Sequence, residues 1–233
     1  TQGVSSAASD VYKRQLRNPV GVITTAVSVL EAKATDNREQ HTLSILSRQA
    51  TLVRRLVDDL LDVGRITRGR LHMRVAEVDL RTVLTDAVDA NRFATERKHP
   101  ALDLELPDAP VVASADHARL VQVVSNLVDN ASKYSPERAG VRVRLRAVGP
   151  AATIEVLDTG PGISPDALPR IFDIFDLGAT SESGGLGLGL GLCKRIVELH
   201  RGTISAGPNP DGHGACFRVT LPCVRPGVAP VAS

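Results

Sequence analysis

The sequence predicts an α+β protein in which a helical hairpin precedes a two-layer α/β sandwich. In the first third of the chain, apolar residues recur at alternating intervals of three and four, which is typical of paired helices. Beyond residue 70, segments with an apolar residue at every second position alternate with amphipathic helical segments. This combination indicates a sheet that is covered on one face by helices.

The composition narrows the classes of function. With 233 residues, 42% of them hydrophobic, the chain can form a packed core, and its net charge of +2 does not favour nucleic acid or an anionic membrane as partner. The three cysteines lack the spacing of metal ligands and indicate a reduced, cytoplasmic setting. No apolar run approaches the ~20 residues that cross a bilayer. We therefore expect a cytoplasmic protein that meets a membrane only through segments upstream of this sequence.

The predicted hairpin covers residues 16–67. Its first helix runs from Leu16 to Ala34, the turn formers of "TDNRE" interrupt it, and a second helix continues from Leu43 to Gly64 with a heptad pattern. The shorter first helix cannot cover the whole apolar stripe of the second, so we expect two hairpins to pair as a four-helix bundle. A coil that only links domains is the alternative, because heptads alone do not reveal function.

The predicted sheet contains strands at 141–148, 152–158 and 216–222, each with alternating apolar and polar residues. Arginine stands at every second position of the first strand. Without interleaved aromatic residues, such a pattern favours a solvated sheet face over a nucleic-acid site. Helical patterns at 78–98 and 116–135 supply the apolar stripes that would cover the other face.

Three polar residues follow one stripe of the second of these helices, beside its core stripe. Asn126, Asn130 and Lys133 recur at intervals of four and three. Asparagine is a mediocre helix former, so two of them one turn apart suggest a task, such as offering amide oxygens to Mg²⁺ while Lys133 neutralises phosphate. A solvated polar flank is the alternative interpretation.

The segment "DTGPG" follows a predicted strand. Asp158 continues the apolar alternation of that strand, so its carboxylate should be buried and needs a donor, such as the exocyclic amine of adenine. Gly160 and Gly162 would let the backbone turn and approach a flat base closely. A turn without a ligand remains the alternative.

A third candidate element is "GGLGLGLGLCKRIVELH", in which alternating glycines lead into a helix. Free amides at a helix N-terminus bind phosphate oxygens. The segment matches neither the dinucleotide fingerprint nor the Walker loop. The preceding residues 168–185 are typical of a lid, with Phe172 and Phe175 packed at its hinge. Gly212 and Gly214 precede the last strand, where close backbone packing is expected.

The order of "NLVDNASKY", "DTGPGI", "IFDIF", "GLGLGL" and "GHGACF" resembles the N, G1, F, G2 and G3 boxes of the sensor histidine kinases of two-component signalling. Their ATP-binding fold, the GHKL fold, is shared with DNA gyrase, MutL and heat-shock chaperones. The resemblance spans Leu16 to about Pro222. It implies a dimerisation and phosphoacceptor hairpin at 16–67 and a catalytic ATP-binding domain at 68–223. The composition of residues 224–233 is that of a linker and predicts a flexible tail. The hairpin separates the sequence from the gyrase and chaperone relatives.

The resemblance also implies roles for single residues. Asn130 would bind Mg²⁺ with help from Asn126, Lys133 and Tyr134 would meet phosphate and ribose, and Asp158 would bind adenine. The other expected ATP contacts lie in the glycine boxes and the lid: Gly160, Gly162, Ile163, Phe172, Gly185, Leu186, Gly187, Leu188, Gly189 and Leu190.

The sequence departs from the family pattern at three positions in the predicted ATP-binding domain. Ile174 stands where a proline is usual, Arg201 where a glycine usually follows "ELH", and Ala215 where a small hydroxyl residue is common. We interpret these changes as adjustments of the lid and of a turn, because none of them removes an expected ligand.

The segment "LRNPV" resembles the phosphoacceptor helix, but Arg14 and Gln15 stand where the family has histidine and glutamate. Position 14 lies two residues before the core residue Leu16, about 200° around the helix, and so faces outward as an acceptor must. Asn18, one turn further, matches a catalytic position of the family. A guanidinium stays protonated and cannot accept a phosphoryl group, so we expect no autophosphorylation of this chain as written.

Two explanations of Arg14 are open, a degenerate kinase or a foreign leader. Asp10 to Gln15 are what the codons GAT GTG TAT AAG AGA CAG specify, and this string resembles a transposon end used in preparing sequencing libraries. We favour a non-native leader at residues 1–15. The remaining histidines lie in unrelated contexts and are not expected to replace the acceptor: His41, His72, His99, His117, His200 and His213.

We therefore expect the ATP- and Mg²⁺-dependent core of a homodimeric histidine kinase. It would transfer the γ-phosphoryl group of ATP to a histidine, and the onward acceptor would be an aspartate in the receiver domain of a response regulator. A non-catalytic dimeric ATP-binding scaffold and a GHKL ATPase of the gyrase or MutL type are the alternatives.

Overall fold

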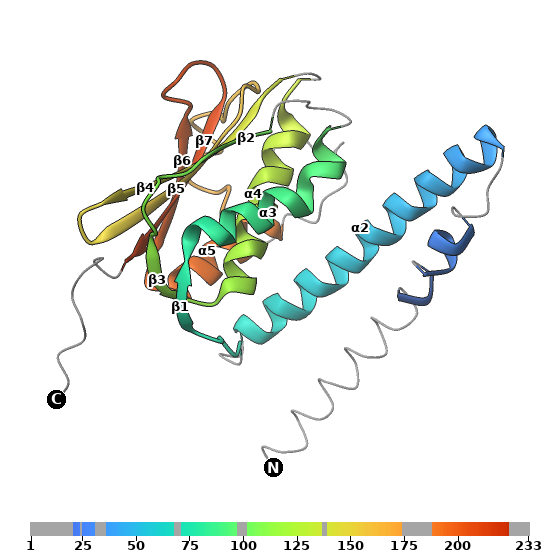
Figure 1. Cartoon of the computed structure of the whole chain (residues 1–233). Coiled ribbons are helices and arrows are strands. Elements are labelled where there is room, and N and C mark those ends of the chain that lie inside the picture. The colour runs from blue at the N-terminus through green and yellow to red at the C-terminus, as the bar shows by residue number, and fades with distance from the viewer. Residues whose placement is uncertain are drawn as a thin grey trace, which may run out of the picture. The chain divides into compact units, whose positions relative to one another are not determined.

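The computed structural model describes residues 21–23, 25–30, 36–67, 71–96, 102–136, 139–173 and 188–223. They fall into two compact units, Thr1–Leu71 and His72–Ser233. Figure 1 shows the long helix α2 in the first unit and a sheet with three helices in the second. This is the predicted order of a helical part followed by an α/β part.

The first unit is helical throughout its described residues, apart from the bend at Asp36 and from Leu71 at its end. Helical residues at 21–23 and 25–30 precede α2 (Asn37–Thr67), which at about 1.5 Å per residue is about 46 Å long. The second helix begins earlier than predicted, since Asn37 and the next two residues of "TDNRE" are already helical and Glu39 suits the positive end of the helix dipole. None of the described helices is long and apolar enough to span a membrane.

The second unit contains a five-stranded mixed sheet with the order β2-β4-β5-β7-β6. Strand β2 is parallel to β4, and the other neighbouring pairs are antiparallel. The strands are β2 (Leu102–Glu105), β4 (Val141–Val148), β5 (Ala151–Leu157), β6 (Thr203–Pro208) and β7 (Ala215–Pro222). Strands β1 (Ala76–Asp79) and β3 (Val112–Ala115) form a separate antiparallel pair.

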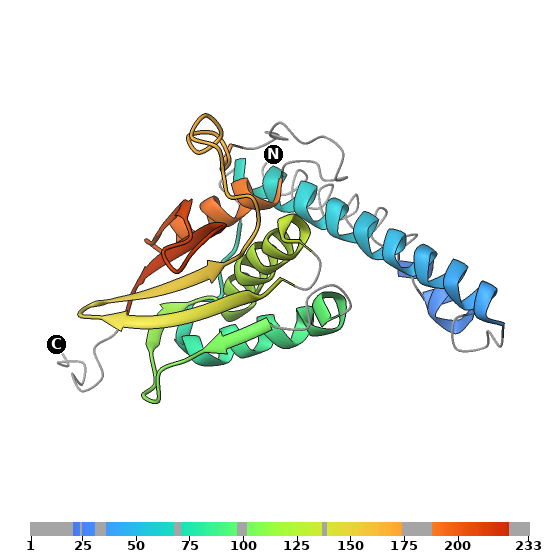
Figure 2. The same cartoon turned by 90° about the horizontal axis from the view of Figure 1, so that it is seen from above.

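Three helices cover one face of this sheet. They are α3 (Leu80–Glu96), α4 (His117–Tyr134) and α5 (Gly189–Leu199). Figure 2 shows the helices on one side of the strands. The apolar positions of β4 are buried on that side together with the predicted core stripe of α4: Val141, Val143, Leu145, Leu120, Val124, Leu127 and Ala131. The predicted two-layer sandwich is therefore confirmed.

Helix α3 begins later than the helical pattern predicted. Val78 and Asp79 pair with β3 and belong to β1, so the helix starts at Leu80. The Asp79 carboxylate accepts from the backbone N–H of Arg81 (3.1 Å) and of Val111 (3.2 Å). Its ion pair with the Arg81 side chain (2.7 Å) lowers the pKa of Asp79. The pairing with β3 and the hydrogen bond from Val111 are long-range contacts, and they place the first two residues of a helical pattern in a strand.

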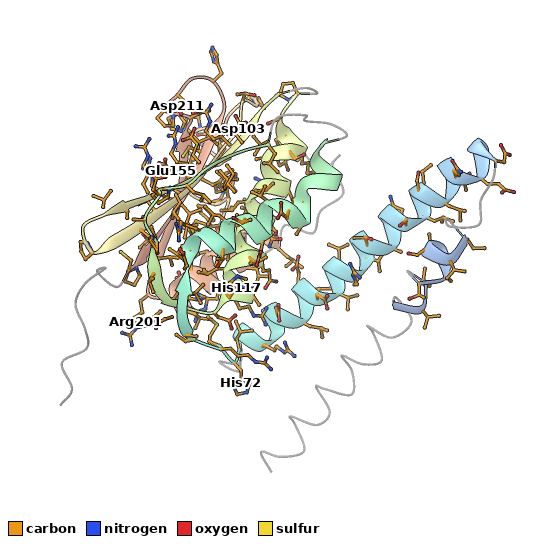
Figure 3. All side chains as sticks on the ribbon, viewed as in Figure 1. His72, Asp103, His117, Glu155, Arg201 and Asp211 are labelled. Carbon is orange, nitrogen blue, oxygen red and sulfur yellow. The ribbon has the colours of Figure 1, made fainter. Side chains whose placement is uncertain are left out.

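The arginine-bearing face of β4 is less solvated than predicted. Arg144 is only 8% exposed, because its guanidinium lies among Glu105 of β2, Glu155 of β5 and Asp211 of the β6–β7 loop. The strand registers align Glu105, Arg144, Glu155 and Arg218 in one row across four strands. Figure 3 shows Glu155 and Asp211 on the side of the sheet away from α3 and α4. Opposite charges directly across strands stabilise this register.

Candidate nucleotide-binding site

The polar stripe of α4 runs from the core to the surface. The helix begins after Asp116, whose Oδ1 accepts from the backbone N–H of Arg119 at 3.2 Å, a standard N-cap. Asn126 is buried, Asn130 is half-buried, and Lys133 in the last turn is exposed. Amide groups therefore lie at the buried end of the stripe, and a cationic side chain lies at its exposed end.

The last two residues of α4 are exposed and contact each other. The Nζ atom of Lys133 stands 5.1 Å from the ring centroid of Tyr134. Such a cation–π contact restricts the long lysine side chain while leaving its ammonium group in solvent. Both residues are therefore available to a polar ligand at this end of α4.

Asp158 directly follows β5 and is 4% exposed. Its Oδ1 accepts from the backbone N–H of Gly160 at 2.8 Å and of Ala215 at 3.1 Å. Within the described part of the chain, both hydrogen bonds to the carboxylate use Oδ1, which leaves Oδ2 for a donor on a ligand. The sequence predicted a buried carboxylate that needs donors. Backbone amides supply them for Oδ1, so a ligand such as the adenine amine is needed only for Oδ2.

Gly160 brings the Asp158 turn against the end of α4. A Cβ atom on Gly160 would lie 2.8 Å from the Tyr134 carbonyl oxygen and 3.0 Å from Asp158 Oδ1. Only glycine permits this approach, so the carboxylate and the polar stripe of α4 lie in one region. Gly162 has φ +79°, a left-handed conformation that glycine adopts without strain.

The end of the loop between β6 and β7 packs against the backbone of Asp158. Gly214 has φ +114°, and a Cβ atom there would collide with the Asp158 carbonyl group. The backbone N–H of Asp158 also donates to the Ala215 carbonyl at 2.9 Å. The close packing that the sequence predicted before the last strand is therefore packing against Asp158.

The beginning of α5 closes the region. Leu188 is buried just before the helix, Gly189 and Leu190 are half-buried, and a Cβ atom on Gly189 would lie 3.9 Å from Nδ2 of Asn126. The free amides of this helix N-terminus therefore lie beside the inner end of the α4 stripe. They are suited to phosphate oxygens.

The residues fit a magnesium ion that is shared with phosphate. Nowhere in the described ranges do three His, Cys, Asp or Glu side chains gather as a metal site. Mg²⁺ commonly binds few protein oxygens together with substrate phosphates and waters, which suits the amide oxygens of Asn126 and Asn130.

Sequence models of two protein families match this chain. The model described as "Histidine kinase-, DNA gyrase B-, and HSP90-like ATPase" matches residues 115–225, and the "His Kinase A (phospho-acceptor) domain" matches residues 11–69. The chain belongs to the histidine kinase family.

Curated relatives agree with this family. The chain is 32% identical to sensor protein KdpD of Escherichia coli, over 94% of this chain and 24% of KdpD. It is 31% identical to sensor histidine kinase MtrB of Mycobacterium tuberculosis, over 93% of this chain and 39% of MtrB. It is 32% identical to adaptive-response sensory kinase SasA of Rippkaea orientalis, over 90% of this chain and 56% of SasA. The chain thus spans between a quarter and little more than half of these relatives.

Solved structures share the fold. Full-length ShkA in complex with AMPPNP superposes with a TM-score of 0.70 at 25% identity, over 94% of this chain and 46% of ShkA. The Acinetobacter baumannii histidine kinase AdeS superposes with a TM-score of 0.62 at 22% identity, over 90% of this chain and 97% of AdeS. The predicted α+β fold of the GHKL type is confirmed.

His200 of this histidine kinase core has a structural role. Its Nε2 accepts the backbone N–H of Asp116 at 2.9 Å, so the ring proton lies on Nδ1, which donates to the Ile196 carbonyl at 2.8 Å. The Nδ1 bond fixes the ring on α5, and the Nε2 bond connects the end of α5 with the start of α4.

Some predicted residues of the histidine kinase lie outside the described residues. They are Arg14, Gln15, Asn18, Ile174, Phe175, Gly185, Leu186 and Gly187. Phe172 and Ile163 are described and half-buried. The match to the phospho-acceptor model includes position 14, where the sequence has arginine.

Asn209 is a residue of this region that the sequence analysis did not single out. It is half-buried in the loop before Gly212 and donates to the Asp158 carbonyl at 2.8 Å. Its position in "NPDGHG" is typical of turns, where asparagine bonds nearby backbone groups. The pattern therefore indicates a turn but cannot indicate a contact with a residue 51 positions away.

Proposed function

We propose that this chain is the ATP-dependent kinase core of a two-component sensor protein. The observation that carries the proposal is the buried Asp158, with one oxygen held by backbone amides, beside the polar stripe of α4 and the start of α5. The similarity to ShkA, a structure solved in complex with the ATP analogue AMPPNP, supports the same interpretation.

In this proposal each part of the site meets one part of ATP. The Asp158 carboxylate accepts a hydrogen bond from the exocyclic amine of adenine, and the adjacent glycines allow the base to approach the backbone. Tyr134 lies at the ribose, Lys133 neutralises phosphate charge, and the amides at the start of α5 bind phosphate oxygens. Asn130, assisted by Asn126, holds a magnesium ion that would neutralise charge on the phosphates during transfer.

The first unit would provide the dimer interface and would carry the phosphoacceptor position, which is Arg14 in this sequence. Leu46, Val53 and Leu60 of α2 form an apolar stripe at intervals of seven and are 44% to 48% exposed. Pairing with a second hairpin would cover this stripe, which supports a homodimer. The onward acceptor would be an aspartate in the receiver domain of a response regulator.

Repair of the acceptor position tests the proposed kinase activity. With Arg14→His and Gln15→Glu, labelled ATP should give acid-labile label on the chain, because an imidazole replaces a guanidinium that cannot accept phosphoryl. The label should disappear when Asn130→Ala is added. Label on the unmodified chain would contradict our interpretation of Arg14.

The arginine at position 14 favours one alternative function, a dimeric ATP-binding scaffold without catalysis. Repaired protein that binds AMPPNP with magnesium in calorimetry but acquires no label would support the scaffold. Protein that binds no adenine nucleotide would overturn both functions.

A further inference from the structure

The side chain of Asn209 bonds backbone groups through both amide N–H donors and through its carbonyl oxygen. Its Nδ2 donates to the carbonyl oxygens of Asp158 (2.8 Å) and His213 (3.3 Å), and its Oδ1 accepts the backbone N–H of Asp211 at 2.9 Å. Two carbonyl oxygens can face only the amide nitrogen, so the orientation of the amide is determined by its partners.

The backbone of Asn209 also closes the loop. Its N–H donates to the Gly214 carbonyl at 3.1 Å, and its carbonyl accepts from the Gly212 N–H at 3.3 Å. No other side chain of similar size supplies two donors and one acceptor in this geometry. An aspartate at this position would place a carboxylate against the carbonyl oxygens of Asp158 and His213.

The loop that Asn209 organises and Ala215, the first residue of β7, together contact both polar groups of the Asp158 backbone. The Asn209 side chain donates a hydrogen bond to the Asp158 carbonyl at 2.8 Å, and the Asp158 N–H donates to the Ala215 carbonyl at 2.9 Å. Gly214 packs against the same peptide group with no room for a Cβ atom. The Ala215 N–H, which immediately follows this contact, is one of the two donors to Asp158 Oδ1. A shift of the loop would therefore rotate the carboxylate.

The same loop is fastened to the outer face of the sheet. Asp211 pairs with Arg144 at 2.8 Å and with Arg142 at 3.2 Å, both on β4. The loop is thus held by ion pairs on the outside and by Asn209 on the inside.

We infer that Asn209 is a positioning residue for adenine recognition. It locks the 209–214 loop to the backbone of Asp158, so that Oδ1 stays bound to Gly160 and Ala215 and Oδ2 is presented to the amine of the base. The inference rests on the proposed function, because it deepens the role of Asp158. It assigns to Asn209 the discrimination of adenine, which carries the amine, from guanine, which carries an oxygen at that position.

The test compares binding of ADP and GDP to the full chain by calorimetry. In the Asn209→Ala variant we expect ADP to bind about tenfold more weakly, as for loss of one well-aligned hydrogen bond to a charged group. Binding of GDP should change little, so the preference for adenine should narrow. Asn209→Asp keeps the acceptor for Asp211 but loses both donors, and should narrow the preference as well.

A second readout needs no nucleotide. Hydrogen exchange of the Gly160 and Ala215 amides should be faster in Asn209→Ala, since both amides bind Asp158 Oδ1. Arg81→Gln serves as the control, because it breaks the ion pair with Asp79 far from the loop. It should lower thermal stability without changing the preference for ADP over GDP.

The outcomes separate the inference from the proposed function. If the unmodified chain prefers ADP and Asn209→Ala retains the full preference, the inference is wrong while the function stands. The inference is also wrong if Arg81→Gln narrows the preference as much. If the unmodified chain binds no adenine nucleotide, the proposed function fails and the inference fails with it.

Discussion

Arg201 adopts a backbone conformation that its position requires but that residues other than glycine rarely take. It follows the last turn of α5 with φ +59°, the one positive value at a non-glycine among the described residues. The Arg201 N–H bonds the Glu198 carbonyl (2.9 Å), and the Gly202 N–H bonds the Val197 carbonyl (2.9 Å), which is the Schellman motif that usually contains glycine at this point. The family pattern of glycine after "ELH" thus has a physical reason.

Replacement of Arg201 by glycine should stabilise the second unit. An L-residue in the left-handed region costs roughly 1–2 kcal/mol, and the greater freedom of glycine in the unfolded chain offsets part of that gain. We expect a net increase of about 0.5–1 kcal/mol in the free energy of unfolding, measured by urea denaturation.

Arg201→Ala is the matched control, because it removes the same side chain but keeps the Cβ atom. It should leave stability nearly unchanged. An equal gain in both variants would locate the cause in the arginine side chain and not in the backbone conformation.

At the scale of elements, the β4 strand joins the core to a row of ion pairs. The hydrogen bond to Glu105 raises the pKa of Arg144, and the hydrogen bonds of Arg144 lower the pKa of Glu105 and of Asp211. Arg144 is buried, and these carboxylates stabilise its charge. The alternation of "VRVRLRAV" therefore separates an apolar face from an ion-paired face, where the sequence alone predicted a solvated one.

The shifted carboxylates predict how stability depends on pH. A folded-state pKa below the unfolded value means that the unfolded chain binds more protons, so stability is present above the ordinary glutamate value of ~4.3 and is lost as pH falls through the folded-state pKa. We expect the melting temperature of the second unit to fall as the pH is lowered from about 5 to about 3.

Arg144→Met should flatten this dependence, because Glu105 and Asp211 lose the partner that contributes most to lowering their pKa. Asp79 would still contribute with the same sign through Arg81, so part of the dependence should remain. An unchanged slope in Arg144→Met, at matched ionic strength, would contradict the assignment of the acid sensitivity to this row.

At the scale of the molecule, the predicted stripe of the first unit is only half covered within one chain. Positions Ala50 and Val57 of α2 are buried or half-buried, whereas Leu46, Val53 and Leu60 are exposed. One hairpin thus satisfies one row of the heptad pattern and leaves the other row to a partner. The proposed dimer follows from this unequal burial.

A charge in the exposed row should separate the dimer. We expect the full chain to be dimeric by sedimentation analysis and Val53→Asp to be monomeric, because two carboxylates would enter an apolar interface. Thr51→Asp, which places the same charge two residues away and about 200° around the helix, should remain dimeric. A monomeric parent, or equal disruption by Thr51→Asp, would refute the proposed interface.

The sequence alone determined the fold class, the helical hairpin and the central strands, because periodicities of 3.5 and 2 persist over many residues of α2, α4, β4 and β7. It also indicated Asp158 and the stripe of Asn126, Asn130 and Lys133 as parts of one site. Only the tertiary structure decided the rest. Strands β1, β2, β3 and β6 have four to six residues, too few for a period to be recognised, and form because distant partners pair with them. The bonds of Asn209 and Arg144 likewise join residues remote in the chain, and local patterns carry no information about such contacts.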